Sequence, residues 1–367
     1  MNFTTINHYV PQWYQQHFLN ENDKFYYLDL CPEKVSNNGH TYRRTAMMHW
    51  GPRICFMREN LYTMRFFNLA SDVIEKRFFG PIDCCGPKIW KGFLGNHLCR
   101  EYIDACRDII HVMDVQWCRT PKGLALIKQQ MDSVGIVMDD NKILALMMKI
   151  HRDNVTVWSE CVWEVVSANH SNTKFLLTDN PVTFYHPLCI PHLSTVCIPP
   201  NEINPWKIGT QVIFPLTSEK CLILTHVESV GSSLSLNLFK LRTNARVYGE
   251  TLKFVGDIIN GRQLCEDDVI KVNFALKQRA LRYVAATNRE WLFPERSFKC
   301  MWQDIRQILM PTLPYDYGSS EIFLHYKDGS SIGVDAFGRP LANPQQKIVE
   351  MKKQVEQLIK NKMNNEV

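Results

Sequence analysis

The feature that most constrains the fold is the run Lys-Phe-Leu-Leu-Thr-Asp-Asn-Pro-Val at residues 174–182, where an apolar, strand-like segment ends in a polar turn. Asp179 and Asn180 can hydrogen-bond their own backbone and start a turn, and Pro181 fixes the exit. A buried strand that ends in a carboxylate and an amide can support a site rigidly. A plain Asx turn explains the same residues, so both interpretations stay open.

Helical patterns flank this strand. An apolar stripe that begins at Asp139-Asp140 predicts one long helix leading into the strand; its members are Ile143, Met147, Ile150, Trp158, Cys161 and Val165. A second helix is expected from Glu266, with a stripe that continues to Tyr283. Residues 211–216 and 221–226 predict two strands of a hairpin. Residues 322–326 and 331–335, which flank Lys-Asp-Gly, predict a second hairpin late in the chain. We therefore predict an α+β fold, with a predominantly helical body and a small, mostly antiparallel sheet.

No repeat or clear linker interrupts the chain. We expect a single helix-rich domain over residues 1–340, with a strand-rich portion at about 174–226. An amphipathic C-terminal helix is expected over residues 344–363 because Ile348, Met351 and Val355 share one face. It either docks on the body or pairs with another copy, which would give a homo-oligomer.

Amino-acid composition limits which cellular compartments and which binding partners are expected. Thirteen cysteines without a Cys-x-x-Cys pair favour a reducing cytoplasm over a disulfide framework. The sequence contains no apolar run of 18 residues, so it predicts no membrane span. The net charge of +5 permits contact with a polyanion without requiring it. One segment is rich in arginine, at positions Arg43, Arg44, Arg53, Arg58 and Arg65.

Standard chemical motifs are missing: the sequence holds no phosphate-cradling Gly-x-x-x-x-Gly-Lys, no Gly-x-Gly-x-x-Gly, no Gly-x-Ser-x-Gly and no His-Glu-x-x-His. What remains is a set of polar residues at expected junctions between elements. These are His8, Glu75, Asp83, Gln116, Arg119, Asp179, Asn180 and Asn273. Each has a structural interpretation when taken singly, and for Asn273 a satisfied core position is favoured.

Together these residues suffice for general acid–base catalysis or for a magnesium-assisted phosphodiester site. Glu75, Asp83 and Asp179 would hold Mg²⁺, because carboxylate oxygens are the ligands this ion prefers. His8 would move a proton or orient water, and Arg119 would hold a phosphate through its two-pronged donors. Gln116 and Asn180 complete the candidate catalytic set.

Four motifs, in this order, resemble the bacterial domain-of-unknown-function family number 4238. They are His8-Tyr9-Val10-Pro11, Gln116-x-x-Arg119-Thr120-Pro121, Thr178-Asp179-Asn180-Pro181-Val182 and Phe214-Pro215-Leu216-Thr217-Ser218. The family's repeated Ile-Glu is similar to Ile74-Glu75, whereas its second copy differs here as Ile82-Asp83. The resemblance implies a soluble, helix-rich bacterial protein, with a role in defence against phage as one expectation.

Two functions follow from these observations. The first is a metal-assisted hydrolase, of nuclease or phosphodiesterase type, acting on nucleic acid or nucleotides. The alternative is a non-catalytic binding or sensor module, in which the polar cluster is structural and the arginine-rich segment contacts a nucleic acid or another polyanion.

Overall fold

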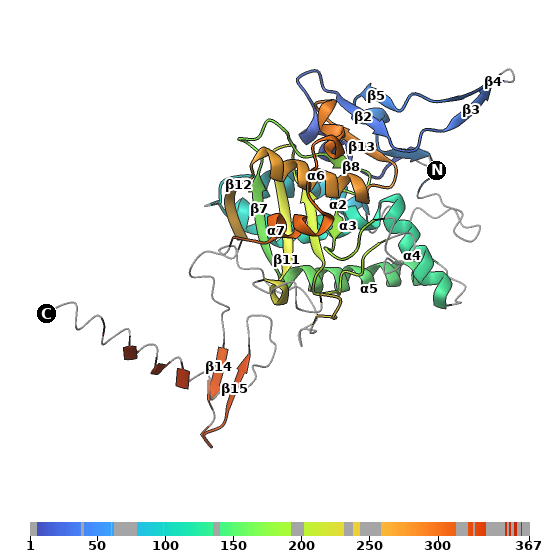
Figure 1. Ribbon diagram of the computed structural model, residues 1–367. Helices are drawn as coiled ribbons and strands as arrows, with labels where there is room; N and C mark the ends of the chain where they lie inside the picture. Colours follow the sequence, from blue (N-terminus) through green and yellow to red (C-terminus); the bar gives the residue numbers. More distant parts are fainter. Residues whose placement is uncertain are drawn as a thin grey trace. The chain divides into compact units, whose positions relative to one another are not determined.

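The computed structural model describes most of the chain, and the following statements concern those residues. They are 6–37, 40–59, 61, 79–97, 99–134, 140–191, 202–230, 238–242, 258–312, 322–325, 327–334, 349–350, 352–353, 356–357 and 361. The chain divides into two compact units (Figure 1). The first comprises Met1–Arg242 with Leu252–Thr312, and the second comprises Thr243–Thr251 with Leu313–Val367.

A five-stranded sheet forms the centre of the first unit. Its order is β12-β7-β11-β10-β9, and among the described ladders only the β12–β7 pair is parallel. The strands are β7 (Cys161–Ser167), β9 (Thr183–Tyr185), β10 (Gln211–Pro215), β11 (Lys220–His226) and β12 (Ile258–Gln263). The predicted hairpin of residues 211–226 is confirmed as β10 and β11, which pair in antiparallel register.

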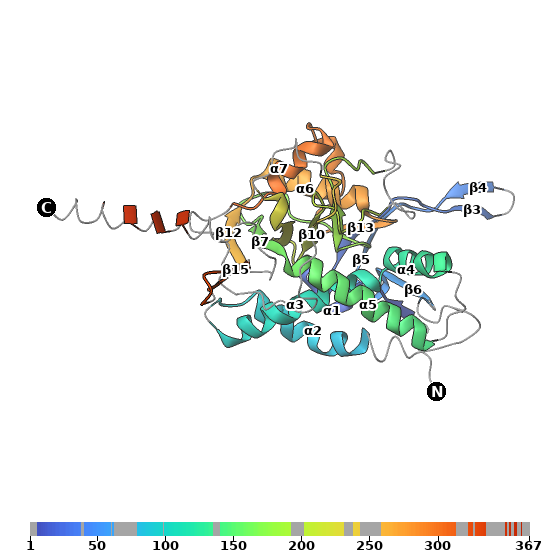
Figure 2. The same cartoon turned by 90° about the horizontal axis from the view of Figure 1, so that it is seen from below.

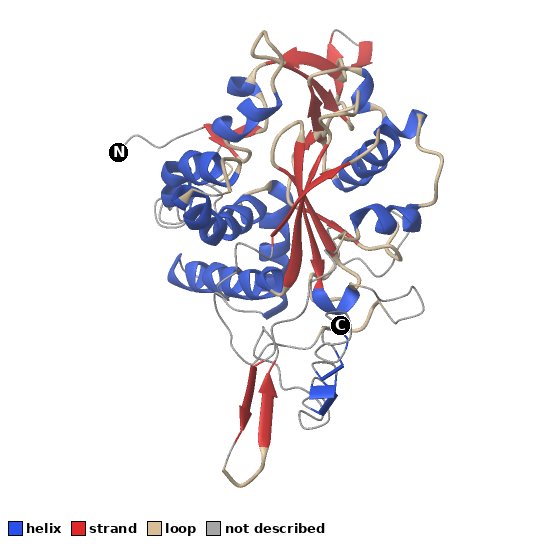
Figure 3. Cartoon of the chain, turned by 90° about the vertical axis from the view of Figure 1, so that its left-hand side faces the viewer, coloured by secondary structure: helices blue, strands red, loops and turns tan. Residues whose placement is uncertain are grey.

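Both faces of this sheet are buried, because successive side chains point to opposite sides of a strand. On β10, Val212 and Phe214 belong to one hydrophobic core and Ile213 belongs to the other. Leu222 and Ile223 of β11 divide in the same way. Figure 3 shows helices on both sides of the strands. Such strands read as continuous apolar runs rather than as alternating patterns.

Helices α2, α3 and α5 contribute to the first core, and α6 and α7 contribute to the second. The helices are α1 (Gln12–Gln15), α2 (Gly80–Phe93), α3 (Arg100–Cys118), α4 (Pro121–Val134), α5 (Asp140–Ser159), α6 (Glu266–Arg279) and α7 (Ile305–Leu309). Short 3₁₀ turns lie at Gln16–Phe18, Pro52–Ile54, Val227–Ser229, Glu290–Leu292, Pro294–Arg296 and Trp302–Asp304. None of the described helices combines the length and apolar composition that crossing a bilayer requires.

A second, four-stranded antiparallel sheet has the order β5-β2-β13-β8. Its strands are β2 (Phe25–Asp29), β5 (Met47–Trp50), β8 (Leu177–Thr178) and β13 (Tyr283–Ala286). Two ribbons accompany it: β1 (Ile6–His8) pairs with β6 (Met57–Glu59), and β3 (Lys34–Asn37) pairs with β4 (His40–Arg43). Strand β8 brings the end of the 174–182 run beside β13, which follows α6 in the chain.

The prediction of a predominantly helical body with one small sheet is wrong, because sheets of five and four strands organise the first unit. The predicted long helix ends at Ser159, and residues 161–167 form β7. Cys161 and Val165 fit a helical spacing by coincidence, while Val162, Val165 and Val166 favour a strand. Tyr283 likewise begins β13 instead of ending the α6 stripe.

The second unit contains a hairpin of β14 (Ile322–His325) and β15 (Ser331–Val334), as predicted from its Lys-Asp-Gly turn. Gly329 adopts a φ of +84°, which favours glycine, and the Ser330 N–H donates to the Asp328 carboxylate at 2.9 Å. Val349 and Glu350 are helical. Most of the helix predicted over 344–363 lies outside the described residues.

Candidate functional site

The carboxylate of Asp179 is committed to backbone donors far away in the sequence. Its two oxygens accept the N–H groups of Leu281, Arg282 and Tyr283, at 2.8, 2.6 and 2.8 Å. Thr178, not Asp179, supplies the side-chain acceptor of the turn at residues 178–180. Its hydroxyl oxygen accepts the Asn180 N–H at 3.2 Å. The Asx-turn interpretation is therefore wrong for Asp179, which instead ties the end of β8 to the start of β13.

Burial raises the pKa of Asp179 to about 6, while the three backbone N–H groups and the positive charge of Lys122 oppose that rise. Only 2% of the residue is exposed. The Asp179 charge in turn adds to the burial that raises the pKa of Tyr9 well above its usual value. The Tyr9 carbonyl accepts the side-chain N–H of Gln116 at 2.9 Å. Tyr9 thus contacts Gln116 through its backbone, while its side chain lies within electrostatic range of Asp179.

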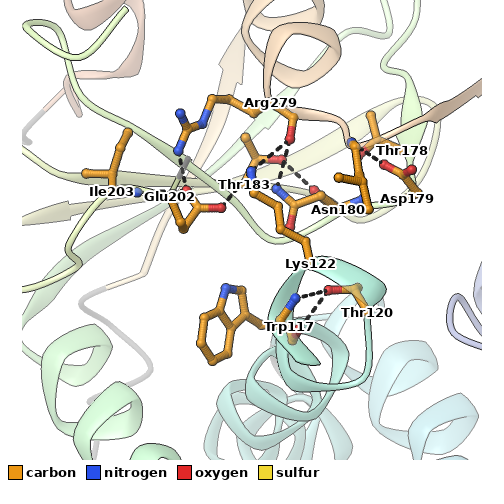
Figure 4. A network of polar contacts seen from close by, with 12 residues as sticks. Trp117, Thr120, Lys122, Thr178, Asp179, Asn180, Thr183, Glu202, Ile203 and Arg279 are labelled. Carbon is orange, nitrogen blue, oxygen red and sulfur yellow. Dashed lines mark hydrogen bonds and ion pairs between the residues drawn. The ribbon is translucent and has the colours of Figure 1, made fainter. Parts of the chain in front are cut away.

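Asn180 helps to close the end of α6. Its side-chain amide donates to the carbonyl of Arg279, the last residue of α6, at 3.3 Å, and Lys122 donates to the same carbonyl at 3.1 Å. Helix C-terminal carbonyls lack partners within the helix, and a cation is favourable beside them. Thr183 anchors the Asn180 carbonyl at 2.6 Å (Figure 4).

Two cations and a carboxylate extend this network. Lys122 lies 2.8 Å from one oxygen of Glu202, and the guanidinium of Arg279 pairs with the other (Figure 4). We name the five residues the junction cluster: Lys122, Asp179, Asn180, Glu202 and Arg279. Burial opposes both charges of the Lys122–Glu202 pair. Burial lowers the pKa of Lys122. At Glu202, the charges of Lys122 and Arg279 outweigh the effect of burial, so the pKa of Glu202 is lowered as well.

The motif Gln116-x-x-Arg119-Thr120-Pro121 spans the end of α3 and the start of α4. The Thr120 hydroxyl oxygen accepts the Gly123 N–H at 3.0 Å, and its O–H donates to the Trp117 carbonyl at 2.9 Å. Threonine at an N-cap followed by proline at the first helical position is a favoured beginning. This local geometry carries Lys122 into the junction cluster.

The remaining predicted site residues have other partners. Arg119 is buried and makes a two-pronged ion pair with Asp83, at 2.6 and 2.9 Å. The half-buried ring of His8 lies 3.1 Å from the Arg53 carbonyl oxygen. Asn273 bridges the Leu176 N–H and the Lys174 carbonyl at 3.0 and 2.8 Å, which confirms the core interpretation. Glu75 lies outside the described residues.

Two of the three residues expected to hold Mg²⁺ have other partners among the described residues. Asp83 and Asp179 already accept a guanidinium and three backbone N–H groups, respectively. Within the described part of the chain, no three His, Cys, Asp or Glu side chains gather as metal ligands. The junction cluster is a buried polar network that joins α4, α6 and the turn after β8. It contains two cationic side chains and two carboxyl groups.

The sequence interpretation missed Lys122, Glu202 and Arg279. Arg279 had a signal, because it continues the Val269, Val272 and Leu276 spacing of the buried α6 stripe as a charged residue. A charge on an apolar face requires a buried partner. Glu202 follows a proline-rich, irregular stretch, and its sequence context carries no comparable signal.

A second candidate lies on the surface, in residues 34–58, which we name the basic segment. It contains Lys34, Arg43, Arg44, Arg53 and Arg58, all exposed, and no aspartate or glutamate. Arg65 of the predicted arginine-rich segment lies outside the described residues. The β3–β4 hairpin of this segment projects beside β2 and β5 (Figures 1 and 2).

The hairpin keeps two cations face to face. Lys34 of β3 lies directly opposite Arg43 of β4 in the antiparallel register. Arg44 is 3.9 Å from Glu33, whose carboxylate is also 3.2 Å from Arg282. Like charges directly opposite each other destabilise a strand pair. Folding alone therefore gives no reason for this arrangement.

The basic segment also contains two exposed aromatic side chains. Tyr42, on the hairpin, is 52% exposed, and Trp50, at the end of β5, is 38% exposed. Cationic grooves with exposed aromatic rings are typical of surfaces that bind single-stranded nucleic acids.

Comparison with protein-family models, with curated proteins and with solved structures finds no match to this chain, so the resemblance carried by the four motifs stays a prediction.

Proposed function

We propose that the protein binds nucleic acid through the basic segment. The junction cluster then has a structural role and stabilises the fold. The observation that carries this proposal is the cross-strand Lys34–Arg43 pair on an exposed hairpin. A phosphate backbone would relieve the repulsion between these side chains and would release counterions on binding. The exposed rings of Tyr42 and Trp50 favour nucleic acid over other polyanions.

The burial of the junction cluster supports the same division of roles. Asp179, Asn180, Glu202 and Arg279 are each at most 3% exposed. Each of these side chains forms a hydrogen bond or an ion pair with another of them or with backbone groups. Satisfied buried networks rigidify and specify a fold.

Hydrolysis receives less support than binding. Two of the three expected metal ligands are engaged in structural contacts, and the third, Glu75, lies outside the described residues. Nuclease activity therefore stays a prediction, which can be checked by incubating the same binding samples with Mg²⁺ or with EDTA.

The test is a binding titration of a fluorescently labelled single-stranded oligonucleotide at several salt concentrations. We expect log K to fall linearly with log salt. The double variant Arg43→Glu/Arg44→Glu should weaken binding strongly and reduce the slope by about 1.4, because each phosphate that a cation no longer neutralises on a single strand removes about 0.7.

Lys88→Glu/Lys91→Glu is the matched control, because it changes the net charge equally at two exposed positions of α2. If both double variants weaken binding equally, the attraction is a property of net charge and the basic segment is not the interface. If the unmodified protein shows no salt-dependent binding, the proposal fails.

A further inference from the structure

A series of hydrogen-bonded side chains joins α3 to α5. It is separate from the junction cluster and from the basic segment. The Asp114 carboxylate accepts from Nδ1 of His151 at 2.7 Å and from the Asn154 amide at 2.6 Å. Nε2 of His151 faces Nδ1 of His111 at 2.9 Å. Asp114 is fully buried, and the two imidazole rings are half-buried.

This geometry fixes the proton positions. Because His151 donates from Nδ1 to the carboxylate, its Nε2 carries a lone pair when the ring is neutral. That lone pair faces Nδ1 of His111, so a single proton lies between the two nitrogens. A carboxylate that accepts one ring N–H and so directs the other ring nitrogen is the arrangement by which proteins orient histidine ligands of a metal, and Asp114 holds His151 in this way.

We propose that His111 and His151 bind a late first-row divalent transition metal, such as Zn²⁺, Ni²⁺ or Cu²⁺, through Nδ1 and Nε2. The metal takes the place of the shared proton, which moves to Nε2 of His111 by exchange with solvent, so that both imidazoles bind as neutral ligands. Asp114 is then a positioning residue that holds the His151 ring and strengthens its ligand nitrogen. Imidazole suits these metals, whereas Mg²⁺ prefers oxygen ligands.

The distances allow this exchange. Two zinc–nitrogen bonds of about 2.0–2.1 Å at a tetrahedral angle place the nitrogens about 3.3 Å apart. The nitrogens therefore need to separate by a few tenths of an ångström from the 2.9 Å contact, and the rings need to turn so that both nitrogens point at a metal beside the line that joins them. His151 is 24% exposed at its side chain, which leaves room for water to complete the coordination.

Electron paramagnetic resonance of the full-length protein, titrated with Cu²⁺, tests the proposal. We expect one tightly bound Cu²⁺ whose spectrum shows coupling to two imidazole nitrogens, and competition by Zn²⁺. His111→Gln should remove the two-nitrogen signal while leaving the Asp114–His151 contact in place. Asp114→Asn should weaken binding about 10- to 100-fold, the usual effect of removing such a supporting carboxylate.

His170→Gln is the control, since it removes an exposed histidine elsewhere. Circular dichroism checks that each variant is folded, and a second readout is the melting temperature. Saturating Ni²⁺ should raise the melting temperature by several degrees in the unmodified protein and in His170→Gln only. If His111→Gln and His151→Gln bind Cu²⁺ with the same affinity and spectrum as the unmodified protein, the proposed site does not exist.

Discussion

Asp179 and Tyr283 are joined twice, although they lie far apart in the sequence. The Asp179 N–H donates to the Tyr283 carbonyl at 3.0 Å, and the Asp179 carboxylate accepts the Tyr283 N–H at 2.8 Å. The first contact continues the β8–β13 ladder, and the second adds a side chain to it. Since the same carboxylate also holds Leu281 and Arg282, one residue fixes the whole connection from α6 to β13.

Asp179→Asn is expected to destabilise the protein. An asparagine offers one acceptor oxygen, and its NH₂ group would face a backbone N–H that now has no acceptor. Each buried N–H group left in this way costs about 1–3 kcal/mol. The measurement is the free energy of unfolding in urea. Asp108→Asn, an exposed change on α3, should stay within about 0.5 kcal/mol of the unmodified protein, and an equal effect of both changes would contradict the structural role.

The same residue predicts an unusual pH dependence. Its pKa rises from 3.8, the ordinary value expected in the unfolded chain, to about 6 in the folded protein. The folded state therefore binds this proton more tightly, and the stability that it contributes is lost as the pH rises through this window. The loss of stability caused by Asp179→Asn should be about 2–3 kcal/mol larger at pH 4 than at pH 7. The opposite trend would show that the folded protein favours the ionised carboxylate.

The fold was only partly predictable from the sequence, for an identifiable reason. Hairpins with local turns were predicted correctly, because residues 211–226 and 322–334 carry their pairing signal within one short segment. Strand β7 was missed because both of its faces are buried, which leaves an apolar run without alternation. Residues 161–167 therefore extended a helical stripe by chance spacing.

Asp179 and Asn180 of the junction cluster could be picked out from the sequence, whereas their contacts could not. Asp179 and Asn180 stood out because a turn followed an apolar run, yet their partners lie about one hundred residues later, at 279–283. Which carboxylate meets which donor depends on β8 pairing with β13, and no local pattern encodes that pairing. The local N-cap at Thr120, by contrast, could have been recognised from Thr-Pro alone.

Asn273 should be as sensitive as Asp179. Asn273→Leu keeps the volume on the α6 stripe but leaves the Leu176 N–H and the Lys174 carbonyl without their partner. We expect a loss of about 1–3 kcal/mol for each of the two groups, measured by urea unfolding. Asn172→Ala is the control, because its exposed amide contacts Glu266 at 3.2 Å and should contribute little. Near-equal effects would show that Asn273 is dispensable to the core.

The Lys34–Arg43 pair predicts that stability and binding change in opposite directions. Lys34→Glu converts a repulsive cross-strand pair into an attractive one, which is worth about 0.2–1 kcal/mol in a strand pair. Backbone amides of residues 34–43 should therefore exchange with deuterium more slowly. The same change removes a cation from the proposed phosphate-binding surface, so oligonucleotide affinity should fall and the salt slope should decrease by about 0.7. Lys88→Glu removes the same charge from α2 and should change neither property. If Lys34→Glu slowed exchange without weakening binding, the repulsion would be unrelated to nucleic acid and the basic segment would lose its proposed role.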